Sequence, residues 1–325
     1  MIQRKGLSKK EGYYISIEMW RIILVLFFLV LPSSLFAENG ITASSYLLIE
    51  MGSLEVVAGK NYHNKLPPAS TTKIMTTILA LEKLKGDEQI VPDSKVTAIP
   101  RSKLNLIPGK RYLSGDLIKG VMVESANDAA YAVGTHIAGS EERFGVMMTE
   151  RARALGADNT QFKNASGLPM AGHYTTCYDL ALILRHALTI ERFPEIASMR
   201  YFLFQNHLQS VRYKNHNRFL FCFDPAIAGK TGFTKASRHC YAGAFEKDGK
   251  VYILTLLGSR DLWGDAVRIL SSLYETLPSD RELRLAKSSA VQLVSLSHTR
   301  EKPQPHQEKK KVRKAKLVKK KKTTS

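Results

Sequence analysis

Short apolar runs on either side of a long central segment predict β-strands. Toward the N-terminus, Ser45–Glu50 and Leu54–Ala58 are separated by Met-Gly-Ser, which is typical of a hairpin. Toward the C-terminus, Cys240–Glu246 and Val251–Leu257 are separated by Lys-Asp-Gly-Lys, in which Asp-Gly favours a tight turn. The pattern therefore predicts one hairpin at each end of the folded region.

Between the two hairpins, apolar residues recur with the period of an α-helix. In residues 70–85, Ile74, Ile78 and Leu81 fall on one face, and Gly86 marks the end. Further helices are predicted at 114–121, 127–137, 141–155 and 177–188.

A last amphipathic helix is expected to close the domain near Leu277. Its apolar side carries Val267, Leu270, Leu273 and Tyr274. Strands at both ends with helices between them indicate one α+β domain over residues 38–277. We expect an antiparallel sheet built from both ends of the domain, with an inserted helical region.

Residues 1–37 have the pattern of an export signal. Basic residues precede the apolar run Ile22–Leu31, and a short segment with small residues follows as far as Ala37. The run is shorter than the roughly 20 residues that span a bilayer. We therefore expect a secretory signal cleaved after Ala37 and a periplasmic or other extracytoplasmic location, with a retained membrane anchor as the alternative.

The formal net charge of +19 suggests at first a nucleic-acid-binding protein. Counted by segment, residues 1–37 contribute +3, residues 38–299 contribute +6 and residues 300–325 contribute +10. More than half of the excess thus lies in a short tail. Export also argues against nucleic acid as a partner.

The segment 278–325 is polar and basic, most of all in Lys309–Lys322, and is expected to be largely disordered. Its bases favour attachment to an anionic membrane or wall surface, by on the order of 1 kcal/mol per basic residue at low salt. A solvated end without a partner is the alternative.

The three cysteines Cys177, Cys222 and Cys240 are too few for a disulfide scaffold. In an exported protein they permit one disulfide and one spare thiol, or they are small buried apolar residues. The chain has no Cys-x-x-Cys, no His/Cys pair at zinc spacing and no His-Glu-x-x-His. The sequence therefore gives little support for a zinc site.

Three short motifs occur once each in a fixed order. Ser70–Lys73 reads Ser-x-x-Lys, Ser125–Asn127 reads Ser-x-Asn, and Lys230–Gly232 reads Lys-Thr-Gly. By average residue usage, Ser-x-x-Lys occurs about once by chance in a chain of this length and Lys-Thr-Gly roughly 0.1 times. Each motif alone is therefore weak, and the set gains its specificity from order and structural setting.

Ser70 stands at the start of a predicted helix, where its side chain is either an N-cap or a nucleophile. Residues i and i+3 share a helix face, so the Lys73 amine is expected within reach of the Ser70 hydroxyl. The helix N-terminus favours a developing negative charge on the serine. If Lys73 is buried near a second cation, its pKa falls and the neutral amine can act as general base. A surface lysine is the alternative.

Ser125 and Asn127 lie between two predicted helices. Either they belong to an ordinary polar loop, or Ser125 relays a proton to a leaving amine and the Asn127 amide holds a substrate peptide group. Lys230, in a strand-like stretch, is the candidate second cation. Thr231 offers a hydrogen bond to a substrate carboxylate, and Gly232 leaves room for substrate against the strand.

The three motifs in this order resemble the signature set of penicillin-binding proteins and serine β-lactamases. The surrounding residues are similar to those of the D-alanyl-D-alanine carboxypeptidases, which are low-molecular-mass penicillin-binding proteins, at Pro68–Thr76, Ser125–Ala130, Asn164–Pro169 and Lys230–Thr234. The resemblance runs from about Ile41 to Leu277. It implies a β-lactamase/DD-peptidase-like fold.

The resemblance also implies a serine peptidase that acts on peptidoglycan stem peptides ending in D-Ala-D-Ala and binds β-lactams as inhibitors. Ser70 attacks the carbonyl of the penultimate D-Ala, and Lys73 takes its proton. Ser125, coupled to Lys230, returns a proton to the departing D-Ala, and the oxyanion lies between the backbone N–H groups of Ser70 and Phe233. Water then hydrolyses the ester, with no metal or organic cofactor. The implied substrate-binding residues are Asn127, Lys230, Thr231, Gly232 and Phe233.

Three features depart from the family pattern. Relatives commonly use an arginine for the substrate carboxylate, and here the candidates Arg218 and Arg260 stand in no matching motif. Some relatives have His before Gly-Leu where this chain has Ser166, which leaves the deacylation machinery open. Many relatives continue into a β-rich domain and an amphipathic helix, for which the 48 residues after Leu277 are too few and too basic.

Other functions of the same fold are alternatives. A serine β-lactamase shares the acylation chemistry, but class A enzymes carry a Glu-x-x-x-Asn loop, and none occurs between Ser125 and Lys230. A DD-endopeptidase or transpeptidase differs only in leaving group or acceptor. An exported binding protein with an inert catalytic fold is disfavoured by the intact motif set. The sequence therefore favours the carboxypeptidase.

Overall fold

The computed structural model describes residues 40–207, 209–287 and 292–294, the last three by their backbone. The predicted signal, residues 1–37, and the basic stretch Lys309–Lys322 lie outside the described residues. Within the described ranges, no helix is both long and apolar enough to cross a membrane.

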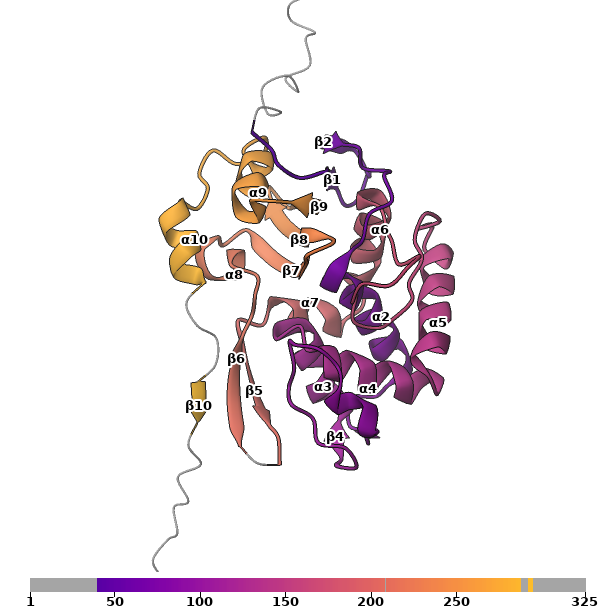
Figure 1. Cartoon of the computed structure of the whole chain (residues 1–325). Helices are drawn as coiled ribbons and strands as arrows, with labels where there is room; N and C mark the ends of the chain where they lie inside the picture. Colours follow the sequence, from indigo (N-terminus) through magenta and orange to yellow (C-terminus); the bar gives the residue numbers. More distant parts are fainter. Residues whose placement is uncertain (1–39, 208, 288–291, 295–325) are drawn as a thin grey trace, which may run out of the picture.

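A five-stranded antiparallel sheet lies at the centre of the molecule, in the order β2-β1-β9-β8-β7 (Figure 1). Its strands are β1 (Ser45–Glu50), β2 (Val56–Lys60), β7 (Ala226–Thr234), β8 (Arg238–Lys247) and β9 (Lys250–Ser259). β1 pairs with β9 along its whole length, from Ser45 opposite Leu257 to Glu50 opposite Tyr252. Both ends of the domain therefore share one sheet, which confirms the predicted α+β architecture.

Both faces of this sheet are buried, because successive side chains of a strand point to opposite faces. In β1, Leu47 and Ile49 belong to the core under the helical region, whereas Tyr46 and Leu48 belong to a second core on the other face. The unbroken apolar run of this strand thus reflects its position in the middle of a three-layered domain.

The inserted helical region packs on one face of the sheet (Figure 1). Its helices are α2 (Lys73–Lys83), α3 (Ser114–Val123), α4 (Asn127–Ala138), α5 (Glu141–Ala154), α6 (Cys177–Ala187) and α7 (Arg192–Ser198). α6 lies against β1 and β9, and α2 contacts α3, α4, α5, α6 and α7. The helix that begins at Lys73 is therefore enclosed by the rest of the helical region.

The opposite face is covered by α8 (Phe219–Cys222), α9 (Leu262–Leu270) and α10 (Asp280–Ala286) (Figure 1). The Phe219 ring lies among Tyr241, Phe245 and Trp263, with ring centroids 5.2 to 6.1 Å apart and edge-on geometry. Aromatic pairs of this kind add to the free energy of apolar burial. They fix α8 and α9 beside β7 and β8.

Two smaller sheets accompany the helical region. β5 (Tyr201–Gln205), β6 (Ser210–Lys214) and β10 (Gln292–Val294) form one, and β3 (Gln89–Ile90) pairs with β4 (Tyr112–Leu113) in the other. The described residues also include the 3₁₀ helices η2 (Ala69–Thr72) and η3 (Ser94–Thr97). η2 precedes α2 directly, so the helix predicted over 70–85 begins with a tighter turn.

The predicted turn at Asp248 and Gly249 is confirmed. β8 and β9 pair from Lys247 opposite Lys250, and φ is 52° at Asp248 and 72° at Gly249. Positive φ at both central residues is what a type I′ hairpin turn requires, and Asp-Gly adopts it readily.

The folded domain extends beyond the boundary predicted at Leu277. α9 ends earlier, at Leu270, and α10 follows, with Leu283 buried in the core of this face. Ser279 and Glu282 form a reciprocal capping box at the start of α10. The sequence contains this Ser-x-x-Glu signal, but a helix with only two buried residues leaves no clear apolar period.

The capping box gives a test of how much α10 contributes to the domain. Ser279→Ala removes the side chain that accepts from the Glu282 N–H, and we expect it to lower the free energy of unfolding by about 1 kcal/mol. Ser198→Ala, at the exposed end of α7, is the matched control and should cost less. Urea denaturation measures both, and equal losses would contradict the role of the cap.

Candidate active site

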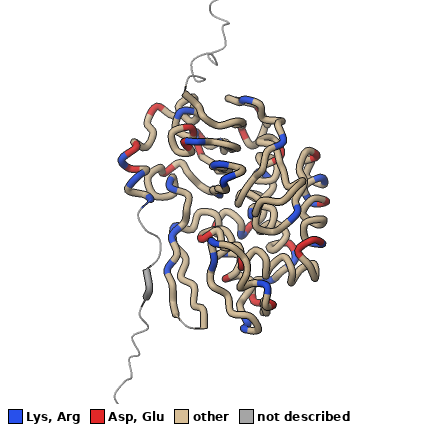
Figure 2. Tube along the Cα trace, in the orientation of Figure 1, with Lys and Arg blue, Asp and Glu red and all other residues tan. Residues whose placement is uncertain are grey.

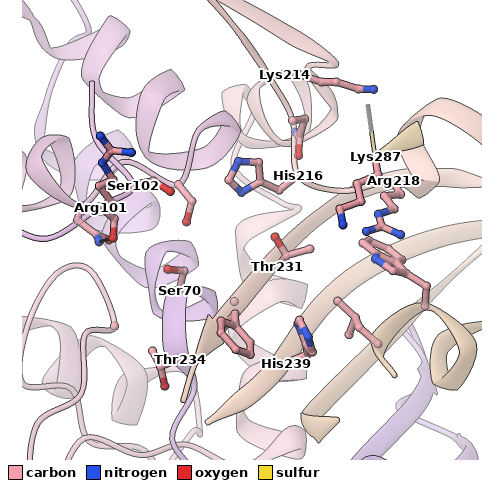
Figure 3. Close-up of a pocket in the computed structure, with 18 of the residues that line it drawn as sticks. Ser70, Arg101, Ser102, Lys214, His216, Arg218, Thr231, Thr234, His239 and Lys287 are labelled. Carbon is pink, nitrogen blue, oxygen red and sulfur yellow. Dashed lines mark hydrogen bonds between the residues drawn. The ribbon is translucent and has the colours of Figure 1, made fainter. Parts of the chain in front are cut away.

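All three sequence motifs meet at one cavity of about 430 Å³. η2 contributes Ser70, the connection between α3 and α4 contributes Ser125, the first residue of α4 is Asn127, and β7 contributes Thr231 to Phe233. Figure 3 shows Ser70 and Thr231 near each other among the lining side chains, as the contacts between η2 and β7 require. The cavity therefore lies where the helical region meets the edge strand of the sheet.

Ser70 is held at the start of the enclosed helix by two close backbone approaches. Ala69, before it, has a φ of 48°, and Gly167 packs against the Ala69 carbonyl so closely that a Cβ there would lie 1.8 Å from the oxygen. A Cβ at Gly232 would lie 2.7 Å from the Ser70 nitrogen. Glycine at both positions lets the backbone of two other segments reach the nucleophile candidate.

The Lys73 amine is fully buried next to Ser70. Its Nζ lies 3.0 Å from Ser70 Oγ, 2.7 Å from Asn127 Oδ1 and 2.6 Å from the Ser166 carbonyl oxygen. Burial, helped by the positive charge of Lys230, holds the pKa of Lys73 well below its ordinary value.

The neutral form of the Lys73 amine fits these three contacts. A neutral amine has two N–H donors and one lone pair. The donors match the oxygens of Asn127 and Ser166, so the lone pair is available to accept from the Ser70 hydroxyl. The arrangement can therefore remove a proton from Ser70.

Asn127 is fixed by the backbone of a neighbouring loop. Its Nδ2 donates to the carbonyl oxygens of Pro100 at 3.0 Å and Arg101 at 2.8 Å, and its backbone N–H donates to Ser102 O at 2.8 Å. The side-chain oxygen thereby points at Lys73. The amide predicted to hold substrate is thus engaged in orienting the lysine.

Ser125 and Lys230 form the second pair of the site. Lys230 Nζ donates to Ser125 Oγ at 2.9 Å and to the Thr231 carbonyl oxygen at 2.8 Å. Burial lowers the pKa of Lys230 to about 7, and the Glu124 carboxylate opposes that shift. Ser125 has a φ of 62°, a left-handed conformation that a non-glycine residue seldom adopts.

Phe233 follows the Lys-Thr-Gly motif at the rim of the cavity. Its side chain is 59% exposed and its ring lies 4.6 Å from that of His239. The side chain of Phe233 thus points away from the core. This position is compatible with the predicted role of the Phe233 backbone N–H in stabilising the oxyanion.

The two carboxylate-binding candidates differ in position. Arg218 lines the cavity, whereas Arg260 is not among the lining residues that the structure describes. Ser166, which replaces the histidine of some relatives, contributes its carbonyl oxygen to Lys73, and its hydroxyl lies 3.2 Å from Asn164 Oδ1.

The three cysteines are free thiols. Cys177 and Cys240 are buried and Cys222 is half-buried, so two of them fit the prediction of small buried residues. Within the described ranges, no group of three or more His, Cys, Asp or Glu side chains gathers as a metal site would require.

A histidine that the sequence does not single out, His173, forms a hydrogen bond with η2. The Nδ1 atom of the buried His173 accepts from the Lys163 N–H at 3.2 Å, so Nε2 carries the proton and donates to Thr72 Oγ1 at 3.0 Å. Burial lowers the pKa of His173 to about 4 and keeps the ring neutral. A lone histidine in a polar segment has neither period nor motif to reveal it.

The family described as D-alanyl-D-alanine carboxypeptidase matches residues 34–261 of the chain. The carboxypeptidase DacF of Bacillus subtilis is 33% identical over 224 residues, which cover 67% of this chain and 57% of DacF. DacC of Escherichia coli K12 is 34% identical over 254 residues, or 72% of this chain and 62% of DacC. The chain thus spans less than two thirds of the length of these two relatives.

Solved structures share the fold. The D-alanyl-D-alanine carboxypeptidase of Mycobacterium tuberculosis H37Rv has a TM-score of 0.68 at 27% identity, covering 73% of this chain and 93% of that protein. A mutant of the Streptomyces K15 DD-transpeptidase has a TM-score of 0.67 at 25% identity, covering 71% and 97%.

The lowered pKa of Lys230 predicts a pH dependence of stability. Its pKa is about 7 in the folded protein and near the ordinary 10.5 in the unfolded chain. Between these values the unfolded chain binds more protons, so this contribution to the free energy of unfolding rises with pH. Lys230→Met removes it, and the stability difference in favour of the wild type should grow from pH 7 to pH 10.

Urea denaturation at several pH values measures this difference. Lys235→Met, at an exposed lysine in the turn after β7, controls for the loss of one positive charge. A difference between wild type and Lys230→Met that stays constant over the range would contradict the buried, neutral amine.

Proposed function

The chain belongs to the D-alanyl-D-alanine carboxypeptidase family, and we propose that it removes the terminal D-Ala from peptidoglycan stem peptides ending in D-Ala-D-Ala, through an acyl-enzyme on Ser70. The observation that carries this proposal is the contact between Ser70 Oγ and a buried lysine whose pKa is lowered. β-Lactams, as acylating inhibitors, belong to the same proposal.

In the acylation step, Ser70 Oγ attacks the carbonyl carbon of the penultimate D-Ala while Lys73 takes the hydroxyl proton. The oxyanion is stabilised by the backbone N–H groups of Ser70 and Phe233. The close approach of Gly232 to the Ser70 nitrogen supports this pairing, because it brings the end of β7 against the nucleophile.

The leaving group then departs as the C–N bond breaks. Ser125 gives its proton to the D-Ala nitrogen and takes one from Lys230. The newly charged Lys73 favours this transfer, since a second positive charge nearby makes Lys230 a stronger acid. The pKa of about 7 lets Lys230 exist in both forms at neutral pH.

Deacylation reverses these transfers. Lys230, now neutral, takes a proton from the attacking water through Ser125, and Lys73 returns its proton to Ser70 as the ester breaks. Each group then regains its starting state. The described lining of the cavity contains no Asp or Glu, so in this proposal the base is an amine and not the glutamate of a class A β-lactamase.

Two substitutions test the function. Purified protein should release free D-Ala from a peptide ending in D-Ala-D-Ala, and a fluorescent penicillin should label Ser70, as mass spectrometry can locate. Ser70→Ala should abolish both activities. Lys73→Arg should keep the fold and lose most acylation, because a guanidinium stays protonated and cannot be the base.

Lys119→Arg, on the surface of α3, is the control for the lysine change and should label normally. Unchanged D-Ala release by Ser70→Ala, or normal acylation of Lys73→Arg at neutral pH, would refute the assignment. Rapid turnover of penicillin without D-Ala release would point to a β-lactamase instead.

We also propose that the protein acts outside the cytoplasm, on the grounds of its signal-like N-terminal segment and of relatives named as D-alanyl-D-alanine carboxypeptidases. The tail around Lys309–Lys322 would then hold the enzyme near an anionic membrane or wall surface by charge.

The tail is tested by retention on anionic vesicles or isolated cell wall. The full chain should bind at low salt and be released as salt rises, because exposed charges are screened. A version truncated after Thr299 should bind less. Retention that does not change with salt concentration, or equal retention of the full and the truncated protein, would overturn this part of the proposal.

A further inference from the structure

We propose that the far wall of the cavity, formed by Lys214, Arg218 and Lys287 and called here the cationic wall, is a subsite for a departing segment that carries a second carboxylate. This inference rests on the proposed function and specifies its substrate class. It concerns the part of the peptide that leaves, not the part that acylates Ser70.

The charged side chains that line the cavity are all positive. The cations of the lining are Arg101, Lys214, Arg218 and Lys287, and no Asp or Glu is among the lining residues that the structure describes. The two histidines of the lining add less charge, because His216 lies 3.6 Å from the Glu124 carboxylate and burial lowers the pKa of His239. A concave wall of one sign, partly shielded from water, concentrates its potential on ligands of the opposite sign. An anionic ligand is therefore the natural occupant.

The cationic wall lies on the leaving-group side of the proposed site. Ser125 and Lys230, which serve the departing nitrogen, are hydrogen-bonded to each other, and Thr231, the candidate partner of the substrate carboxylate, follows Lys230 and lines the same cavity. Figure 3 shows Arg218 and Lys287 beyond Thr231 as seen from Ser70. A group bound there would be attached to the departing residue.

Arg218 is held in place without a carboxylate. Its guanidinium lies 5.1 Å from the centre of the Trp263 ring, a cation–π contact that consumes no N–H donor. Among the described residues, no Asp or Glu forms an ion pair with it. The planar donor set of Arg218 is thus available for a carboxylate, which an arginine can bind with two parallel hydrogen bonds.

The cations of this wall also oppose one another. Burial and then the charge of Arg218 lower the pKa of Lys214, and burial lowers the pKa of Arg218. A bound anion reduces the repulsion between like charges that lie close together. A terminal D-Ala brings one carboxylate, so the positive lining favours a departing segment that brings a second one.

Binding to the Ser70→Ala protein tests the subsite apart from catalysis. The probes are acylated dipeptides ending in D-Ala-D-Glu and in D-Ala-D-Gln, which have similar shape and differ by one carboxylate. We expect the D-Glu peptide to bind about tenfold more tightly, a difference of about 1.4 kcal/mol. The preference should fall toward equality in Arg218→Gln and in Lys287→Gln, each made in the same Ser70→Ala protein, and should shrink at high salt.

Lys235→Gln, outside the cavity lining, is the matched control for the loss of one charge and should keep the preference. Equal binding of the two peptides by the Ser70→Ala protein would overturn the subsite, as would a preference that survives both Arg218→Gln and Lys287→Gln. Release of D-Ala from D-Ala-D-Ala by the wild-type protein reports separately on the proposed function, so the two failures are distinguishable.

Discussion

Two lysine side chains, Lys73 and Lys230, are buried side by side without a hydrogen bond to any carboxylate of the described chain. Burying an amine is costly unless it loses its charge or finds acceptors. The site supplies hydrogen-bond partners of modest strength, an amide, two backbone carbonyls and two hydroxyls, and these favour a neutral or readily titrated amine over a fixed cation. The chemistry of the site follows from this choice, since a carboxylate beside Lys73 would keep it protonated and end its use as a base.

The topology makes this arrangement possible. The enclosed helix α2 brings Lys73, the connection before α4 and the first residue of α4 bring Ser125 and Asn127, and the edge strand β7 brings Lys230. None of these segments alone places two amines near two serine hydroxyls. The glycines at 167 and 232 allow the segments to approach the nucleophile at backbone distance, so the helical region and the sheet together define the site.

The sequence predicts those parts of the molecule whose signal is periodic or whose residue types are rare in combination. The strand Ser45–Glu50, the turn at Asp248 and the three motifs are of this kind. The parts that the sequence does not predict depend on contacts with residues that are distant in the sequence. α8 is a single turn set by aromatic packing, α10 buries only two residues, and the engagement of Asn127 by loop carbonyls requires knowledge of where that loop lies.

The pairing of β1 with β9 joins residues more than two hundred positions apart, as Ser45 opposite Leu257 illustrates. β1 cannot complete its hydrogen bonds until β9 has been synthesised, more than two hundred residues later. Pairing between strands so far apart in the sequence slows folding. β7, which carries Lys230, belongs to the same late-formed block of strands. Ser70 and Lys73 therefore stay without their partner until nearly the whole domain is available, so assembly of the site should be among the last events of folding.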